Sequence, residues 1–199
     1  FKNLPKYGQF RRKFNINSRI ILYLGRISKT KGLDFAINAF YELCKDIDDI
    51  VFVIAGIDDG YMTKLQKLIR KLKLNSKVKF TGPLSEKDKR SALLDADLFI
   101  HTVQYMGGVG IAPLEAILCN TPVIVTKECG EIIKDAKCGY LVEYGDINDL
   151  KEKMKLLLEN SEIGEKMVRR GRKYIETNLA WDKVIKEVEK VYESCIYNI

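Results

Sequence analysis

Two basic side chains, Arg26 and Lys31, lie in a short loop that directly follows the first strongly apolar run of the chain. The loop reads GRISKTKG and is bounded by Gly25 and Gly32. Arginine offers a planar fork of donors and lysine a compact point charge, so the pair could neutralise a diphosphate without a metal ion. The spacing is not that of a P-loop, and a solvated turn between a strand and a helix would use the same residues. This loop alone therefore leaves a phosphate site and an ordinary turn both open.

A second loop is rich in glycine and stands before a short apolar helix, IAPLEAIL. Gly107 and Gly108 would let a phosphate approach the backbone closely. The first-turn N–H groups of a helix lack partners within it and carry its partial positive charge. Here they belong to Gly110, Ile111 and Ala112. We therefore expect phosphate oxygens to bind at this helix N-terminus.

Glu115 occurs one turn into that apolar helix, where a carboxylate is costly unless it is paired or faces a ligand. Such a carboxylate is well suited to accept hydrogen bonds from two ribose hydroxyls. The alternative is a glutamate that only interacts with the dipole of a nearby helix N-terminus. The glycine pattern lacks the third glycine of a dinucleotide fingerprint and follows the fourth strand instead of the first, so a Rossmann dehydrogenase is disfavoured.

Short β-rich apolar runs alternate with amphipathic stretches of helical period from residue 19 onward. This alternation predicts an α/β fold, a Rossmann-like doubly wound parallel sheet of about six strands with helices on both faces, followed by C-terminal helices. The predicted strands cover residues 20–24, 50–55, 78–81, 97–102, 122–126 and 139–143. The predicted helices cover residues 32–46, 60–73, 86–95, 110–119, 146–159, 162–177 and 181–195, with Ser85 and Asp146 as N-caps. Ligands of such sheets bind beyond the carboxyl ends of the strands, where both loops fall.

The composition restricts the partners and the compartment. The 199 residues carry 34 Lys and Arg against 27 Asp and Glu, a net charge of +7 that suits a polyanion or a phosphate ligand. Lysines such as Lys64, Lys67 and Lys71 are interpreted as solvated helix faces, and no basic run interleaved with aromatic residues indicates a nucleic acid partner. The five cysteines lack a C-x-x-C pair, which is typical of reduced thiols. The sequence shows no signal peptide and no transmembrane run, so we expect a cytoplasmic protein.

The order of these features resembles the C-terminal domain of family 4 glycosyltransferases, which have the GT-B fold of two facing Rossmann-like domains. The similarity covers nearly the whole chain and runs through LYLGRISKTKG, FVIAG, VKFTGPLSEKD, ALLDADLFIHT, VGIAPLEAILCNTPVIVT and GEIIKDAKCGYLVEYGD, then a final helix opened by Trp181. It implies a domain that binds a nucleoside diphosphate sugar, while an N-terminal domain, of which this chain shows no counterpart, holds the acceptor. It also implies a retaining, metal-independent transfer with no cofactor.

The resemblance further implies roles for individual residues. Arg26 and Lys31 match the basic pair that binds the donor diphosphate, and Glu115 matches the second glutamate of the E-x7-E motif, which binds the ribose. Leu84 would pack on the base. Backbone contacts would come from Gly25, Gly107, Gly108 and residues 110–112. The sequence departs from the pattern at Gly107, where the family has a carboxylate that contacts the donor sugar.

The two ends of the chain are expected to belong with the missing N-terminal domain. Residues 1–18 are interpreted as a linker with a short helix, residues 19–178 as the nucleotide-sugar-binding domain, and residues 179–199 as a helix that crosses back to the N-terminal domain. Without that domain the apolar stripe of the helix is exposed, so self-association through it is a further expectation. The stripe consists of Trp181, Val184, Ile185, Val188, Val191 and Tyr192. The resemblance also allows a peripheral membrane location through the missing domain.

Two other functions stay open on the sequence. A nucleotide-sugar epimerase could use the same fold, but it would need acid and base residues clustered at the sugar. A non-catalytic nucleotide-binding or interaction module would fit the missing carboxylate at Gly107. Asp95 and Asp97 form a D-x-D pair, yet they fall where a helix ends and a strand begins, so we expect no metal there. His101 ends the fourth strand, where a hydrogen bond to the backbone is the expected role.

Overall fold

The computed structural model describes residues 4–105 and 110–197, so Gly107 and Gly108 lie outside the described residues. Its centre is a six-stranded sheet in the order β3-β2-β1-β4-β5-β6, and every neighbouring pair of strands is parallel. The strands are β1 (Arg19–Leu24), β2 (Ile50–Ala55), β3 (Val78–Gly82), β4 (Leu98–His101), β5 (Val123–Thr126) and β6 (Tyr140–Val142). The order reverses between β1 and β4, and ligands bind at such switch points.

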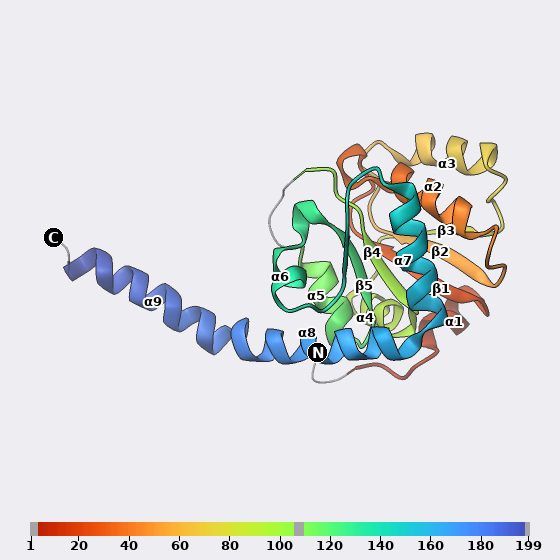
Figure 1. The fold of residues 1–199 in the computed structure, drawn as a ribbon. Coiled ribbons are helices and arrows are strands. Elements are labelled where there is room, and N and C mark those ends of the chain that lie inside the picture. Colours follow the sequence, from red (N-terminus) through yellow and green to blue (C-terminus); the bar gives the residue numbers. More distant parts are fainter. Residues whose placement is uncertain (1–3, 106–109, 198–199) are drawn as a thin grey trace.

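Helices connect the strands and cover both faces of the sheet (Figure 1). They are α1 (Gln9–Phe14), α2 (Leu33–Leu43), α3 (Met62–Lys71), α4 (Glu86–Asp95), α5 (Ile111–Leu118), α6 (Glu131–Asp135), α7 (Ile147–Glu159), α8 (Ser161–Asn178) and α9 (Trp181–Tyr197), with short 3-10 turns at Lys29–Lys31 and Lys127–Cys129. Alternate residues of the buried strands point to opposite faces and so divide the interior into two cores. One core joins the sheet to α2, α3 and α7, and the other joins it to α1, α4, α5 and α6.

The predicted α/β architecture is confirmed. The strand at Ile50–Ala55 and the helix at Glu86–Asp95 have the predicted bounds, and the side chains of Ser85 and Asp146 accept N-cap hydrogen bonds as expected. The helix predicted to run to residue 46 ends at Leu43, because the N–H groups of Asp46 and Ile47 both turn back to the Leu43 carbonyl. The short helix α6 was not predicted.

The segment before β1 packs on the domain through two aspartates. Asp95, which is 1% exposed, accepts hydrogen bonds from the backbone N–H groups of Gly8, Phe10 and Arg11 at 2.5, 2.8 and 3.1 Å, and so caps α1. Asp97 pairs with the Arg11 guanidinium at 2.6 Å and accepts the N–H of Ile20 at 2.7 Å. Both carboxylates of the D-x-D pair therefore hold α1 and the start of β1.

The last helix, α9, extends away from the sheet beyond α8 (Figure 1). Every α9 side chain that the structure describes is exposed, and the stripe predicted from Trp181 to Tyr192 is 36–76% exposed. Across the described ranges, none of the helices combines the length and the apolar character that crossing a bilayer requires.

Candidate functional site

A cavity of about 230 Å³ opens where β1, β2 and β3 end. Parallel strands deliver their following loops to the same edge of the sheet, so three loops meet here. The lining residues are Leu24, Gly25, Arg26, Ala55, Gly56, Ile57, Pro83, Leu84 and Lys89. The structure thus brings together Gly25, Arg26 and Leu84, which the sequence placed in one donor site.

The floor of this cavity depends on two loop backbones that lie very close together. Gly25 donates its N–H to the Ala55 carbonyl at 3.0 Å, and Gly56 donates to the Gly82 carbonyl at 3.0 Å. A Cβ atom on Gly56 would collide with the carbonyl oxygen of Gly25. Only glycine at position 56 therefore allows the β1 and β2 loops to form a common wall.

Arg26 stands at the rim of the cavity with 70% of its side chain exposed. Its guanidinium pairs with Asp59 at 3.3 Å, and its backbone carbonyl accepts the hydroxyl of the buried Tyr23 at 2.8 Å. Burial raises the pKa of Tyr23, so this hydroxyl stays protonated and keeps donating. The loop backbone is fixed from below while the guanidinium remains available to an anion.

Glu115, on α5, forms an ion pair with Lys89 of α4 at 2.9 Å, and both side chains are 17% exposed. Lys89 also pairs with Glu86 at 3.1 Å. Burial opposes the charge on Lys89, but its hydrogen bonds to Glu115 and Glu86 outweigh that effect and raise its pKa. The sequence predicted that Glu115 would be paired or face a ligand, and the structure supplies the pair. Because Lys89 lines the cavity, this pair connects Glu115 to the cavity wall.

Lys31 lies apart from this cavity, at the end of β4. Its backbone carbonyl accepts the Thr102 hydroxyl at 3.0 Å, and a Cβ on Gly32 would collide with the Thr102 carbonyl oxygen. Its ammonium group has no ion-pair partner among the described residues. The positive charge of Lys31 contributes to lowering the pKa of His101. Lys31 is therefore directed toward the β4 end of the site rather than toward Leu84.

The N-terminus of α5 lies beside His101. The helix starts at Ile111, Gly110 is its N-cap, and no side chain caps it. A Cβ atom added to Gly110 would lie 3.2 Å from Nε2 of His101. Gly110, Ile111 and Ala112 thus occupy the helix end expected from the sequence, and Ile111 is 72% exposed.

Within residues 4–105 and 110–197, Nδ1 of His101 does not make the backbone hydrogen bond expected of this side chain. The ring is 7% exposed and stacks with the rings of Tyr23 and Phe99 at centroid distances of 6.1 and 6.4 Å. Its Nδ1 is buried and has no hydrogen-bond partner among the described residues. Burial, with the nearby charge of Lys31, lowers the pKa of His101 to about 4. The imidazole is therefore neutral at pH 7.

Two groups that sequence reasoning did not assign to the site take part in it, Asp59 on Arg26 and Lys89 on Glu115. Asp59 was interpreted as part of a turn. Lys89 follows the Ser85 cap by one helical turn, which directs it back toward the loop, and that spacing was the available signal. Within residues 4–105 and 110–197, no three His, Cys, Asp or Glu side chains gather in a way that could hold a metal ion.

The chain is similar to known proteins over most of its length. Residues 8–174 match the family model described as "Glycosyl transferases group 1". A glycosyltransferase of Methanocaldococcus jannaschii is 31% identical over 176 residues, which cover 86% of this chain and 47% of that protein. The chain spans about half the length of the curated relatives it matches. Their names describe transferases, so the comparisons do not support the epimerase alternative.

Solved structures give the same result. The C-terminal domain of a glycosyl transferase group 1 protein from Francisella tularensis is 25% identical with a TM-score of 0.78, over 87% of this chain and 93% of that chain. S. aureus TarM, solved in a complex that includes UDP, is 25% identical with a TM-score of 0.81, over 96% of this chain and 37% of that chain.

Proposed function

Because the chain belongs to the group 1 glycosyl transferases, we propose that it is the domain that binds the nucleoside diphosphate sugar in an enzyme of that kind. The observation that carries this proposal is the cavity at the ends of β1 to β3. It combines an apolar floor, the exposed guanidinium of Arg26 and the Lys89–Glu115 pair within one small volume. Apolar walls with a few placed polar groups are typical of small-molecule sites.

The base of the nucleotide enters the cavity and packs on Leu84, while the ribose faces Glu115. Lys89 holds Oε1 of Glu115, which leaves the second oxygen to accept a ribose hydroxyl. Arg26 lies on one side of the diphosphate, and Lys31 with the N-terminus of α5 lies on the other. This orientation is a proposal supported by the order of these groups along the edge of the sheet.

The chemistry that such a site supplies is electrostatic. Negative charge grows on the diphosphate as the bond to the sugar breaks, and fixed cations with a helix N-terminus stabilise that charge without reorganisation. Arg26 and Lys31 are the proposed catalytic residues in this sense. Since two cations of the chain itself face the diphosphate, we propose a metal-independent transfer, and by resemblance to family 4 a retaining one.

The acceptor and the complete reaction belong to a longer protein in this proposal, because the chain spans about half the length of its relatives. S. aureus TarM was solved with UDP, which supports a nucleoside diphosphate as ligand here. All five cysteines are unpaired, and burial raises the pKa of Cys119 and Cys138 to about 11. Unreactive, unpaired thiols of this kind support a cytoplasmic location.

A second candidate is a nucleotide-binding module without catalysis. Gly107 stands where family 4 has a carboxylate on the donor sugar, and that substitution favours this reading. The two candidates differ in the sugar: a domain that transfers it must hold it, whereas a sensor can bind the diphosphate alone. A sugar conjugate that binds more tightly than the bare diphosphate favours transfer, and one that binds equally or more weakly favours the module without catalysis.

Isothermal titration calorimetry of the chain with UDP, GDP, ADP and CDP tests the proposal. We expect one of them to bind in EDTA as well as in Mg²⁺, and its sugar conjugate to bind no more than about tenfold tighter. A requirement for Mg²⁺ would contradict the two-cation site. Absence of binding by all four diphosphates and their sugar conjugates would contradict the proposed function itself.

A further inference from the structure

The whole net charge of the chain resides in one segment. Residues 60–85 contain seven Lys and Arg and no Asp or Glu, while the other 173 residues hold 27 cationic and 27 acidic side chains. The cations of this segment are Lys64, Lys67, Arg70, Lys71, Lys73, Lys77 and Lys79. Charge this unevenly distributed creates a local positive field that an evenly mixed surface lacks.

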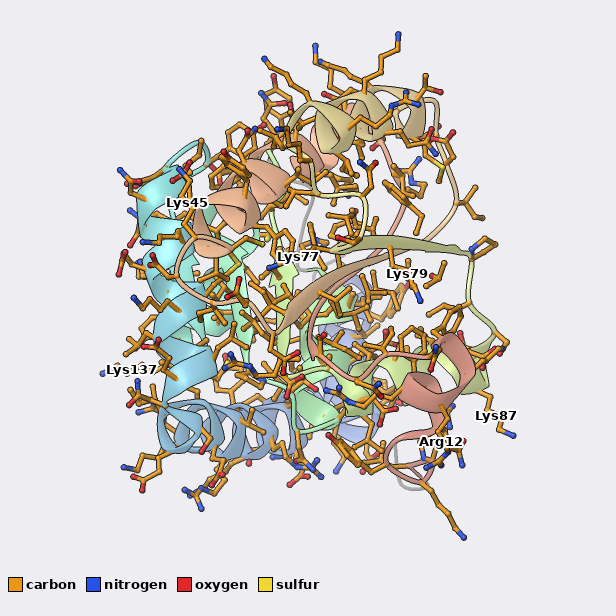
Figure 2. The ribbon with its side chains drawn as sticks, turned by 90° about the vertical axis from the view of Figure 1, so that its right-hand side faces the viewer. Arg12, Lys45, Lys77, Lys79, Lys87 and Lys137 are labelled. Carbon is orange, nitrogen blue, oxygen red and sulfur yellow. The ribbon has the colours of Figure 1, made fainter. Side chains whose placement is uncertain are left out.

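The structure places most of this charge on the outer face of α3. At 100° per residue, Lys64, Lys67, Arg70 and Lys71 fall within an arc of about 120°. Leu65 and Ile69 lie on the opposite side, where they are buried in the core. Figure 2 shows nitrogen-tipped side chains projecting outward from α3, and it labels Lys77, which directly precedes β3, and Lys79, which lies on β3.

Lys67, Arg70 and Lys71 are exposed and have no acidic partner within ion-pair distance in the part of the chain that the structure describes. Some exposed lysines elsewhere do have an acidic partner, as Lys13 has Asp88 and Lys45 has Glu42. From the sequence, the lysines of α3 were interpreted as a solvated helix face. Such a face does not require a cluster of cations that lack acidic partners. The face instead suits a partner that supplies the negative charge.

From this charge complementarity, we propose that the outer face of α3 docks onto an anionic membrane surface. Clustered Lys and Arg are attracted to anionic headgroups additively, without insertion of apolar groups. The face is a single convex helix and is mostly lysine. Of the two aromatic rings nearest this face, Tyr61 is buried in the core, and Phe80 is partly buried at a cavity that it lines with Arg70. No residue of α3 is aromatic, whereas nucleic acid binding uses exposed aromatic rings on which successive bases stack.

The position of α3 gives this surface a consequence for the proposed site. Gly56 and Ile57, in the loop that leads to α3, line the cavity. Docking through α3 would therefore hold the mouth of the cavity near the headgroups. The inference does not depend on the proposed function, because an anionic membrane can bind α3 whatever the cavity holds.

The test is co-sedimentation of the whole chain with vesicles. We expect binding to phosphatidylcholine vesicles with about one-third phosphatidylglycerol, no binding to pure phosphatidylcholine, and release when NaCl rises from about 50 to about 300 mM. The variant Lys67→Gln, Arg70→Gln, Lys71→Gln should lose about tenfold or more in partitioning. The control variant Lys134→Gln, Arg169→Gln, Lys173→Gln removes the same charge from exposed positions on α6 and α8, and should stay within about twofold.

Thermal melting establishes that both variants are folded before they are compared. Equal loss in the two variants would mean that only net charge matters and would overturn the proposal. So would binding to neutral vesicles, or tighter binding of duplex DNA or single-stranded RNA than of anionic vesicles at the same salt. Unchanged nucleotide affinity in the α3 variant is expected, so failure of this proposal and failure of the proposed function are read out separately.

Discussion

Arg26 shares its guanidinium with Asp59 through an ion pair whose two side chains are 70% and 51% exposed. Exposed pairs of this kind contribute little by themselves, so a phosphate can replace the carboxylate easily. We expect Arg26→Ala to weaken binding of the nucleoside diphosphate by roughly 1.5 to 3 kcal/mol, the scale of a charge-assisted hydrogen bond. Asp59→Asn should leave the affinity unchanged or raise it, because it frees the guanidinium. Calorimetry of the three proteins measures both effects.

The matched control is Arg12→Ala, which removes an exposed arginine of α1. An equal loss of affinity in Arg12→Ala would show that net charge, not the cavity rim, is responsible. Lys31→Ala should weaken binding on the same scale as Arg26→Ala. If neither variant changes the affinity, the diphosphate binds elsewhere.

Lys89 holds Glu115 in place and is a positioning residue for the ribose contact. We expect Lys89→Met, which keeps the apolar stem and removes the charge, to weaken diphosphate binding about tenfold, since Glu115 loses the hydrogen bond that orients it. Lys87→Met removes an exposed lysine of the same helix and should have no effect. Calorimetry measures both affinities. If the two variants bind the diphosphate equally well, Lys89 has no role in the site.

We expect the free energy of unfolding to depend on pH because of His101. Its pKa falls from 6.5 in the unfolded chain to about 4 in the fold, so between these values the unfolded state binds more protons. The free energy of unfolding should therefore fall as the pH drops through this window, by about 3 kcal/mol in total from this group. His101→Phe should remove that part of the slope. Urea unfolding at pH 7 and near pH 4.5 checks it, and a slope that is the same in both proteins would rule out His101 as its source.

At the scale of elements, α1 depends on a carboxylate from another helix. Asp95 accepts three backbone N–H groups at the start of α1 and is almost fully buried. Asp95→Ala leaves these donors without a partner, so we expect a loss of about 2 to 3 kcal/mol in the free energy of unfolding. Asp135→Ala, at an exposed helix end, should change it by less than about 0.5 kcal/mol. Urea unfolding of both variants measures the difference, and comparable losses would contradict the capping role.

Local patterns were sufficient to predict most of the elements. Buried parallel strands appear in the sequence as apolar runs, and Ser85 and Asp146 mark the starts of two helices as N-caps. The sheet and its helices could therefore be predicted from the sequence. The loops that hold Gly25, Arg26 and Leu84 were candidates because they follow strands, and the resemblance to family 4 glycosyltransferases assigned these three residues to one site. Long-range pairs were different. The spacing from Ser85 indicates only that Lys89 points toward its loop, because its bond to Glu115, 26 residues away, depends on how the chain folds, and so does the cap of α1 by Asp95.

At the scale of the whole molecule, two exposed surfaces differ in kind. The face of α3 carries unpaired cations, and the stripe of α9 carries large apolar side chains. The first suits an anionic surface and the second an apolar one. Because α3 and α9 are separate helices with different chemistry, added salt should weaken binding through α3 only. Truncation of α9 should remove the apolar contact and leave binding through α3 unchanged.

The last prediction concerns α9. A helix of 17 residues is marginally stable in water, and no described side chain of α9 is buried against the rest of the domain. We therefore expect this chain to self-associate, with the stripe from Trp181 to Tyr192 packed against a second copy. Sedimentation velocity over about a hundredfold range of concentration should show a mass that rises with concentration. Val188→Ser with Val191→Ser should restore a monomer, whereas Glu189→Ser with Glu193→Ser, on the polar face of the same helix, should not. A wild-type chain that stays monomeric throughout, with slow hydrogen exchange along α9, would show that the helix needs no partner.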